Sequence, residues 1–250
     1  MVLLYLYFLV VHIYEKEIAK LDNSFNNIMS IDLGLTNLAT MTFLDHSESC
    51  ILNGKPVKAV NSFVNNKISY LQMTQMKCKK TSKIKDTKQI KRLRKYRENY
   101  INNYFHKASK RIINTAYEHK VKTIVIGDIS LIKQEMNYNK SFVQLPLQRL
   151  VKLIKYKAEL IGMEVKIIKE SYTSGCSSLD IEPINKAHYN KSRRIKRGLF
   201  KSNTGLLINA DVNGSLNILR LYVKDKSIPK LIKEARGKGH VNSPIKLRVA

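Results

Sequence analysis

The sequence has little that would anchor it in a membrane or cross-link it covalently. Its three cysteines, Cys50, Cys78 and Cys176, form no C-x-x-C pair, so neither a disulfide framework nor a zinc ribbon can be read from them. The opening apolar run, MVLLYLYFLVV at residues 1–11, is shorter than the roughly 20 apolar residues of a membrane-spanning helix. It also lacks the basic start and small-residue cleavage site of a secretory signal. We therefore expect a cytoplasmic protein with no membrane partner, and we interpret residues 1–11 as a buried strand.

Acidic residues are also scarce. The 250 residues include 19 Asp and Glu against 45 Lys and Arg, which gives a net charge of +26 and a pI near 10.0. Neutralising phosphates releases condensed counterions, so a chain with this balance is expected to bind DNA or RNA. A basic surface that serves only solubility is the alternative. Because 44% of the residues are hydrophobic, the chain can also bury a substantial core.

The order of predicted elements indicates an α/β protein with a mixed sheet of the RNase H-like (RuvC) type. Apolar stretches between Asn27 and Val60 predict a meander of three short strands, and residues 61–119, which lack Gly and Pro, predict two helices. The remaining expected elements are a buried parallel-type strand at 121–128, a helix at 142–161 with Gly162 as its C-cap, a strand at 163–170, a basic insertion at 171–204, a strand at 205–210, a helix at 211–224 and a basic tail at 223–250.

The few acids are placed where such a sheet would gather them. Asp32 lies in the first strand, Glu170 ends the 163–170 strand, and Asp211 opens the last helix, where it is also expected as the N-cap. Cleavage of a phosphodiester with two metal ions needs several hard oxygen ligands at one place, which suits carboxylates and Mg²⁺ or Mn²⁺. We therefore expect these three residues to be the catalytic and metal-binding acids, although each alone is more often a turn or cap residue.

Two basic clusters are candidate nucleic-acid contacts. Eleven Lys or Arg lie between Lys77 and Arg97, and seven lie between Lys186 and Lys201. The expected phosphate ligands are Lys91, Arg92, Arg94, Lys95, Arg193, Arg194, Lys196 and Arg197. For the second cluster a solvated loop is an equal alternative. The aromatic residues that follow the first cluster, Tyr96, Tyr100, Tyr104 and Phe105, are expected to face the core, with base stacking as the alternative.

Several long strings resemble the TnpB/OrfB family encoded by insertion sequences. IDLGLTNLAT (31–40) resembles the first RuvC motif of that family, and NADVNGSLNI (209–218) resembles its third. NYFHKASKRII, TIVIGDIS, YKAELIGMEVKIIKESYTS, RRIKRGLF and GHVNSPIKLRV follow the family in the same order. The resemblance, which runs from about Ile28 to the end, implies a RuvC-like nuclease domain at 27–222. It also implies an RNA-guided DNA endonuclease, related to type V CRISPR effectors, with DNA and a guide RNA as partners.

The chain departs from that family at three places. Gly127 stands where many relatives have the second acid, but a subset resembles this chain in having Gly there and a Glu before the YTS string, which is Glu170 here; Asp128 is the fallback ligand. Relatives commonly carry four zinc-binding cysteines in the insertion at 171–204, whereas this one has only Cys176, so no zinc is expected.

The third departure concerns residues 1–26, which are expected to be only a remnant of the family's N-terminal wedge-type region. Two hypotheses follow: a truncated metal-dependent nuclease, or a DNA- or RNA-binding remnant or regulator that no longer cuts. A transposase that joins DNA ends itself ranks below both, because the sequence has no catalytic tyrosine signature.

Overall fold

The computed structural model describes residues 20–79, 86–128, 145–196, 198–238 and 243–249. The run at residues 1–11, which we expected to form a strand, lies outside these ranges. Within the described ranges, no helix is both long enough and apolar enough to cross a lipid bilayer.

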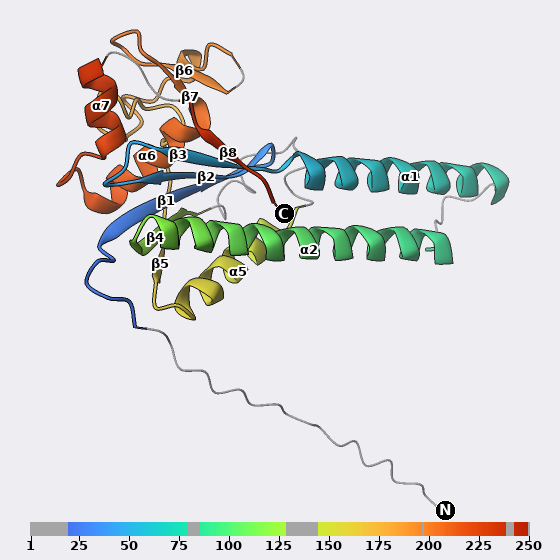
Figure 1. Cartoon of the computed structure of the whole chain (residues 1–250). Coiled ribbons are helices and arrows are strands. Elements are labelled where there is room, and N and C mark those ends of the chain that lie inside the picture. Colours follow the sequence, from blue (N-terminus) through green and yellow to red (C-terminus); the bar gives the residue numbers. More distant parts are fainter. Residues whose placement is uncertain (1–19, 80–85, 129–144, 197, 239–242, 250) are drawn as a thin grey trace, which may run out of the picture.

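A six-stranded mixed sheet forms the centre of the molecule, in the order β5-β4-β1-β2-β3-β8 (Figure 1). The predicted meander is confirmed: β1 (Asn27–Leu33), β2 (Asn37–Phe43) and β3 (Ser49–Asn53) pair antiparallel. On the other side of β1, β4 (Val121–Gly127) runs parallel to β1, and β5 (Glu164–Ile168) runs parallel to β4. The carboxyl ends of the parallel strands β1, β4 and β5 therefore lie side by side at the same end of the sheet.

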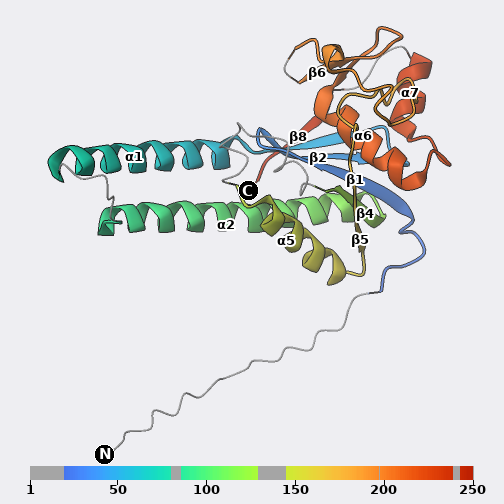
Figure 2. The ribbon, with the colours of Figure 1, turned by 180° about the vertical axis from the view of Figure 1, so that it is seen from behind.

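Two long helices, as predicted, project from the sheet and lie side by side (Figures 1 and 2). They are α1 (Lys55–Lys79) and α2 (Lys88–Glu118). We expected a strand to continue to Val60, but α1 already begins at Lys55, whose backbone N–H is bound by the Asn53 side chain. Pro56 also suits a helix start, because its fixed φ is helical and its missing N–H would have no partner in the first turn.

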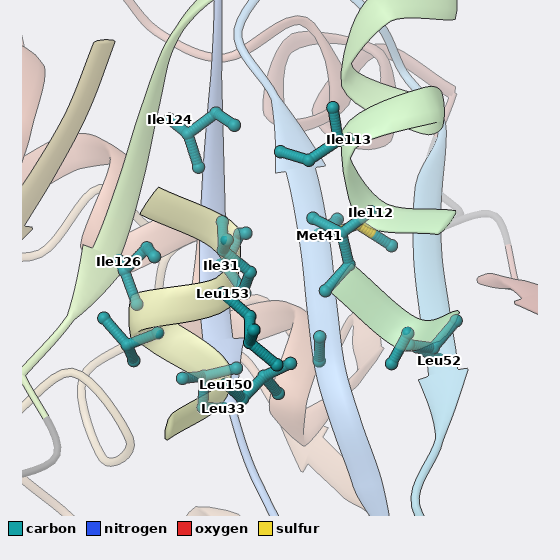
Figure 3. Close-up of a cluster of buried hydrophobic side chains, with 14 of the residues drawn as sticks. Ile31, Leu33, Met41, Leu52, Ile112, Ile113, Ile124, Ile126, Leu150 and Leu153 are labelled. Atoms are coloured by element: carbon teal, nitrogen blue, oxygen red, sulfur yellow. The ribbon is translucent and has the colours of Figure 1, made fainter. Parts of the chain in front are cut away.

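One face of the sheet is covered by α2 and α5 (Leu147–Glu159), and the main apolar core lies between them (Figure 3). Ile31 and Ile126 of the sheet, Ile112 of α2, and Leu150 and Ile154 of α5 are fully buried there. Each such side chain contributes on the order of 1.5–3 kcal/mol of transfer free energy. Residues i and i+2 of a strand share a face, so this packing sends Ile31 into the core and Asp32 to the opposite face.

The opposite face is covered by α6 (Ala210–Val223), which lies against β1, β2 and β4. Three buried hydroxyl groups join helix and sheet: Ser30, Thr42 and Ser215 lie within 2.7–3.0 Å of one another. The Ser30 hydroxyl also donates to the Ser215 carbonyl oxygen at 2.7 Å. Small polar residues therefore let α6 approach the sheet closely without leaving these hydroxyls unsatisfied.

The basic insertion at 171–204 folds beside α6 as loops, a short 3₁₀ helix (Lys191–Arg193) and β6 (Leu199–Lys201), which pairs with β7 (Leu207–Asn209). Polar side chains of α6 hold it: Asn213 binds Ser178 and the Cys176 carbonyl, and Asn217 binds the carbonyls of Thr173 and Cys176. These hydrogen bonds fix the insertion against α6.

The fully buried Arg220 of α6 extends this network. It donates to the Glu182 carbonyl, to the Asn217 side chain and to the Asp225 carboxylate. The Glu182 carboxylate in turn accepts from the Ser177 backbone N–H and from Arg193. The buried charge of Arg220 is thus paired and hydrogen-bonded, as burial requires.

Residues 223–250 are more than the basic tail we expected. They include α7 (Lys230–Lys238), whose Leu231, Ile232 and Ala235 pack with α6 and the insertion in a second apolar cluster. They also include β8 (Ile245–Leu247), which pairs parallel with β3 at the edge of the sheet. Apolar residues at 231, 232 and 235 follow helical spacing, and this is the signal that the sequence analysis overlooked.

Candidate active site

The side chain of Asp32 projects from β1 on the face of the sheet that α6 covers. The parallel register places its neighbour Ile31 beside Ile126, so Asp32 lies beside Gly127 at the same level of the sheet. Above it is Gly214 of α6, where an added Cβ atom would stand only 2.8 Å from the Asp32 Oδ2 atom. The absence of a side chain at position 214 therefore leaves room for the Asp32 carboxylate between helix and sheet.

We expected Glu170 to end a strand, but β5 ends at Ile168 and Glu170 lies two residues beyond it. Its carboxylate nevertheless reaches back over β4. A Cβ atom at Gly127 would stand 1.9 Å from the Glu170 Oε2 atom. The Glu170 carboxylate thus occupies the space that a side chain at position 127 would need, next to Asp32.

Asp211 lies in the first turn of α6. We had expected it to be the N-cap, and this is wrong. The cap is Asn209, whose side chain accepts from the backbone N–H groups of Asp211 and Val212. The Asp211 carboxylate is left to point toward β2, where the Asn37 Nδ2 atom donates to its Oδ2 atom at 2.7 Å. Arg194 of the insertion approaches its other oxygen at 3.8 Å.

The charges of the other two acids act on Asp32. Burial raises the pKa of Asp32 well above its ordinary value, and the negative charges of Glu170 and Asp211 raise it further, while Arg194 opposes the rise. Burial, followed by the charge of Asp128, raises the pKa of Glu170 to about 7. The structure therefore gathers negative charge at a place where the Asp32 and Glu170 carboxylates are costly to ionise.

Asp128, the fallback ligand, is adjacent to this group and contributes to the raised pKa of Glu170. Its backbone N–H donates to the Ile168 carbonyl, which continues the β4–β5 pairing by one residue. Across the described ranges, no three or more His, Cys, Asp or Glu side chains are arranged so that they could hold a metal ion without rearrangement. The carboxylates converge on Asp32 but do not form a closed ligand cage.

The predicted basic residues fall into two groups. Lys91, Arg92, Arg94 and Lys95 are exposed on the first turns of α2, at the end of the two-helix arm that is remote from the sheet (Figure 1). Arg94 forms an ion pair with Asp86 there. The structure therefore does not bring this cluster to the carboxylates.

The second basic cluster lies in the insertion, beside the acids. Arg194 is near Asp211, and Lys196 is exposed, whereas Arg197 lies outside the described residues. Arg193 already has a partner within the insertion, because its guanidinium is 2.6 Å from the Glu182 carboxylate.

The aromatic residues of α2 differ in how deeply they are buried. Phe105 is buried in the core, as expected, and Tyr104 packs partly against it and donates to the Asn53 carbonyl. Tyr96 is 51% exposed, so the expectation that all four face the core is wrong for this residue.

Most of the chain matches known proteins. Residues 12–133 match the OrfB_IS605 family, described as a probable transposase, and residues 148–218 match the TNB domain of Cas12f1-like proteins. A TnpB-like protein, ORF457 of Acidianus two-tailed virus, is 25% identical over 203 residues, which are 79% of this chain and 42% of the viral protein. The chain is therefore similar to the TnpB/OrfB family over most of its length.

Solved structures show that this chain shares its fold with Cas12f proteins. A Cas12f1 protein in a complex with single guide RNA and target DNA matches with a TM-score of 0.60 and 17% identity, over 80% of this chain and 51% of the other. A CRISPR-Cas12f ternary complex matches with a TM-score of 0.62 and 19% identity, over 82% of this chain and 40% of the other. This chain thus spans about half, or less, of the length of these relatives.

Two residues that contact the acids were not predicted. Gly214 and Asn37 both lie inside the strings that resemble the family motifs, but nothing local in the sequence assigns them a contact. Asn37 is 174 residues from Asp211 in the chain, and only the folded arrangement brings the two together.

Proposed function

We propose that the chain is a metal-dependent DNA endonuclease of the RNA-guided type, in which Asp32, Glu170 and Asp211 bind Mg²⁺ or Mn²⁺. The observation that carries the proposal is the convergence of three acids from distant segments, expressed in the effect of Glu170 and Asp211 on the pKa of Asp32. Carboxylates whose pKa is raised by burial and by neighbouring charges cluster at functional sites.

The donor set suits hard divalent cations. All three side chains offer carboxylate oxygens, which Mg²⁺ and Mn²⁺ prefer, and the set contains no thiol or imidazole that would favour zinc. A bound cation would offset the repulsion among the acids and stabilise charge on the phosphate during hydrolysis. Because the acids do not form a closed cage, we expect Glu170, which lies on a loop, to adjust when the cation binds.

Other residues prepare the site. Asn37 fixes the orientation of the Asp211 carboxylate through its hydrogen bond, and Gly127 and Gly214 leave space for Glu170 and Asp32. Arg194 stands beside the acids with a permanent positive charge, suited to a phosphate oxygen of the strand. The sheet order β3-β2-β1-β4-β5 supports an RNase H-like fold.

The partners that we propose are DNA and a guide RNA. The net charge of +26 supports strong binding of polyanions, and one Cas12f1 neighbour was solved with single guide RNA and target DNA. The basic start of α2 is an extended positive surface remote from the acids, which suits contacts with a duplex backbone better than contacts with the strand being cut.

A second candidate is a nucleic-acid-binding protein that does not cleave. It is favoured by the finding that the described part of the chain has no set of three acids ready to hold a metal ion as it stands. In this case the basic surfaces would bind DNA or RNA, and the carboxylates would be without a catalytic role.

Cleavage of labelled single-stranded DNA separates the two candidates. The intact protein is incubated with Mg²⁺ or Mn²⁺ beside an Asp32→Ala variant, and binding to the same DNA is measured in EDTA. The endonuclease predicts metal-dependent products from the wild type and none from the variant, with DNA binding retained by both. Binding without any metal-dependent product from the wild type would leave only the second candidate.

A further inference from the structure

Two tyrosines form an aromatic surface beside Glu170 that neither the acids nor the basic residues explain. The rings of Tyr172 and Tyr189 lie 5.7 Å apart between centroids and are inclined at 68°, an edge-to-face arrangement. Tyr172 is 40% exposed although it is a large aromatic residue, and it follows Glu170 by only two positions.

The backbone holds this pair rigidly in place. Tyr172 has φ of +67°, a left-handed conformation that is costly for a residue other than glycine. Its carbonyl accepts the backbone N–H groups of Gly175 and Cys176, and the neighbouring Thr173 hydroxyl donates to the Glu170 carbonyl. The Thr173 carbonyl is bound in turn by the side chain of Asn217 on α6.

Gly175 determines the position of the second ring. An added Cβ atom at Gly175 would stand 2.4 Å from the Cδ2 and Cε2 atoms of Tyr189, so the ring lies directly against the backbone of this glycine. The Asn190 backbone N–H also donates to the Gly175 carbonyl. Both rings are therefore ordered before any ligand arrives, which lowers the entropy lost on binding.

The chain segments that carry the pair are rich in lysine. Lys169, Lys186 and Lys191 are exposed on the same segment, while the two acids of the insertion are already engaged. Asp180 accepts the Asn203 backbone N–H, and Glu182 accepts from Arg193. The exposed ring of Tyr172, backed by the half-buried ring of Tyr189 on a lysine-rich segment, fits a ligand that has flat apolar faces and negative charges at regular spacing.

We propose that Tyr172 and Tyr189 form a stacking platform for unpaired bases of the DNA strand that enters the carboxylate site. Unpaired bases expose their faces, whereas the bases of a duplex already stack on one another, so the platform selects single-stranded over double-stranded DNA. Stacking is tolerant of sequence, because every base has a flat aromatic face. The proposal rests on the proposed function for the reason that a strand should reach this place.

Binding measured in EDTA tests the platform without requiring any cleavage. A single-stranded oligonucleotide carrying 2-aminopurine, whose fluorescence falls on stacking, is titrated with the wild type and with Tyr172→Ala, Tyr172→Leu and Tyr172→Phe. We expect quenching with the wild type and Tyr172→Phe, and about ten-fold weaker binding with little quenching for Tyr172→Ala and Tyr172→Leu. Leucine keeps apolar bulk but has no aromatic face, so it separates stacking from apolar contact.

Two controls make the result specific. Tyr156→Ala removes a comparably exposed ring from α5, on the opposite face of the sheet, and should leave binding unchanged. The affinities of Tyr172→Ala and the wild type for a blunt-ended duplex should agree within about two-fold. The proposal is overturned if folded Tyr172→Ala and Tyr189→Ala bind the single strand as the wild type does, or if duplex binding weakens equally. Failure of cleavage alone would affect only the proposed function.

Discussion

Substitution of Gly127 by alanine tests the carboxylate arrangement most directly. The new Cβ atom would stand 1.9 Å from the Oε2 atom of Glu170 and 2.9 Å from the Cδ1 atom of Ile218. Ordinary contact begins at 3.4 Å, so the Glu170 carboxylate must withdraw by about 1.5 Å. Both obstructing atoms are at the ends of flexible side chains, so the fold can accommodate the methyl group. A displacement of about 1 Å in a reacting site costs roughly 100-fold in rate.

The assay combines activity with stability. We expect Gly127→Ala to cleave labelled single-stranded DNA about 100-fold more slowly in Mg²⁺ while its urea midpoint changes little. Gly237→Ala is the matched control, because a Cβ atom there meets nothing within 4 Å. It should keep full activity and gain up to about 1 kcal/mol from improved helix propensity. A wild-type rate for Gly127→Ala, or a loss that follows unfolding, would refute the reasoning.

Exchanging the two residues extends the same argument. A glutamate at position 127 would project its carboxylate from β4 into the space that the Glu170 carboxylate now occupies. We therefore expect the double variant Gly127→Glu/Glu170→Gly to regain part of the activity that Glu170→Gly alone loses. If the double variant is as inactive as the single one, the two positions are not alternative sources of the same carboxylate.

Three further predictions concern the neighbouring contacts. Asn37→Ala removes the 2.7 Å hydrogen bond to Asp211 and should lower activity by about 10- to 100-fold while raising the Mg²⁺ concentration needed, which a metal titration measures; an unchanged titration would assign Asn37 a structural role only. The folded pKa of Glu170, about 7, exceeds its ordinary 4.5, so in EDTA this group's contribution to stability is complete below about pH 4.5 and is lost as the pH rises through about 7. Urea midpoints at pH 5 and pH 8 should therefore differ more for the wild type than for Glu170→Gln, and equal differences would contradict the assignment. Arg220→Ala leaves the Asp225 carboxylate and buried oxygens unpaired and should lower the free energy of unfolding by about 3–5 kcal/mol, as measured with urea. Because these contacts hold the insertion, EDTA should not increase its proteolysis in the wild type. An increase would indicate that a bound metal holds the insertion instead.

Local patterns predicted most of the sheet and both long helices. The β1–β3 meander and β4 could be recognised because apolar runs and turn residues are signals within a few positions. The start of α1 was missed because the apolar residues on both sides of Asn53–Pro56 were taken as one strand, although Gly54 and Pro56 mark a break between them. The edge strand β8 was missed because three residues paired on one side carry almost no periodicity.

The site was predicted less completely than the fold. Asp32 and Asp211 could be named from motif strings, and Glu170 from its place before the YTS string. The sequence could not show that Glu170 reaches its position from a loop beyond β5, or that Gly127 makes room for it. These contacts depend on distances between segments far apart in the chain, for which composition and periodicity carry no information.

The pairing of β8 with β3 has a consequence for handling the protein. An uncovered outer strand offers its N–H and C=O groups to any other chain and promotes association between molecules. Residues Ile245–Leu247 occupy that side of β3, so the outermost strand is the three-residue β8 instead of the five-residue β3, and it offers fewer free backbone groups. Purification tags attached next to this segment, or deletions that remove it, should therefore lead to self-association even when the carboxylates and the helical arm are intact.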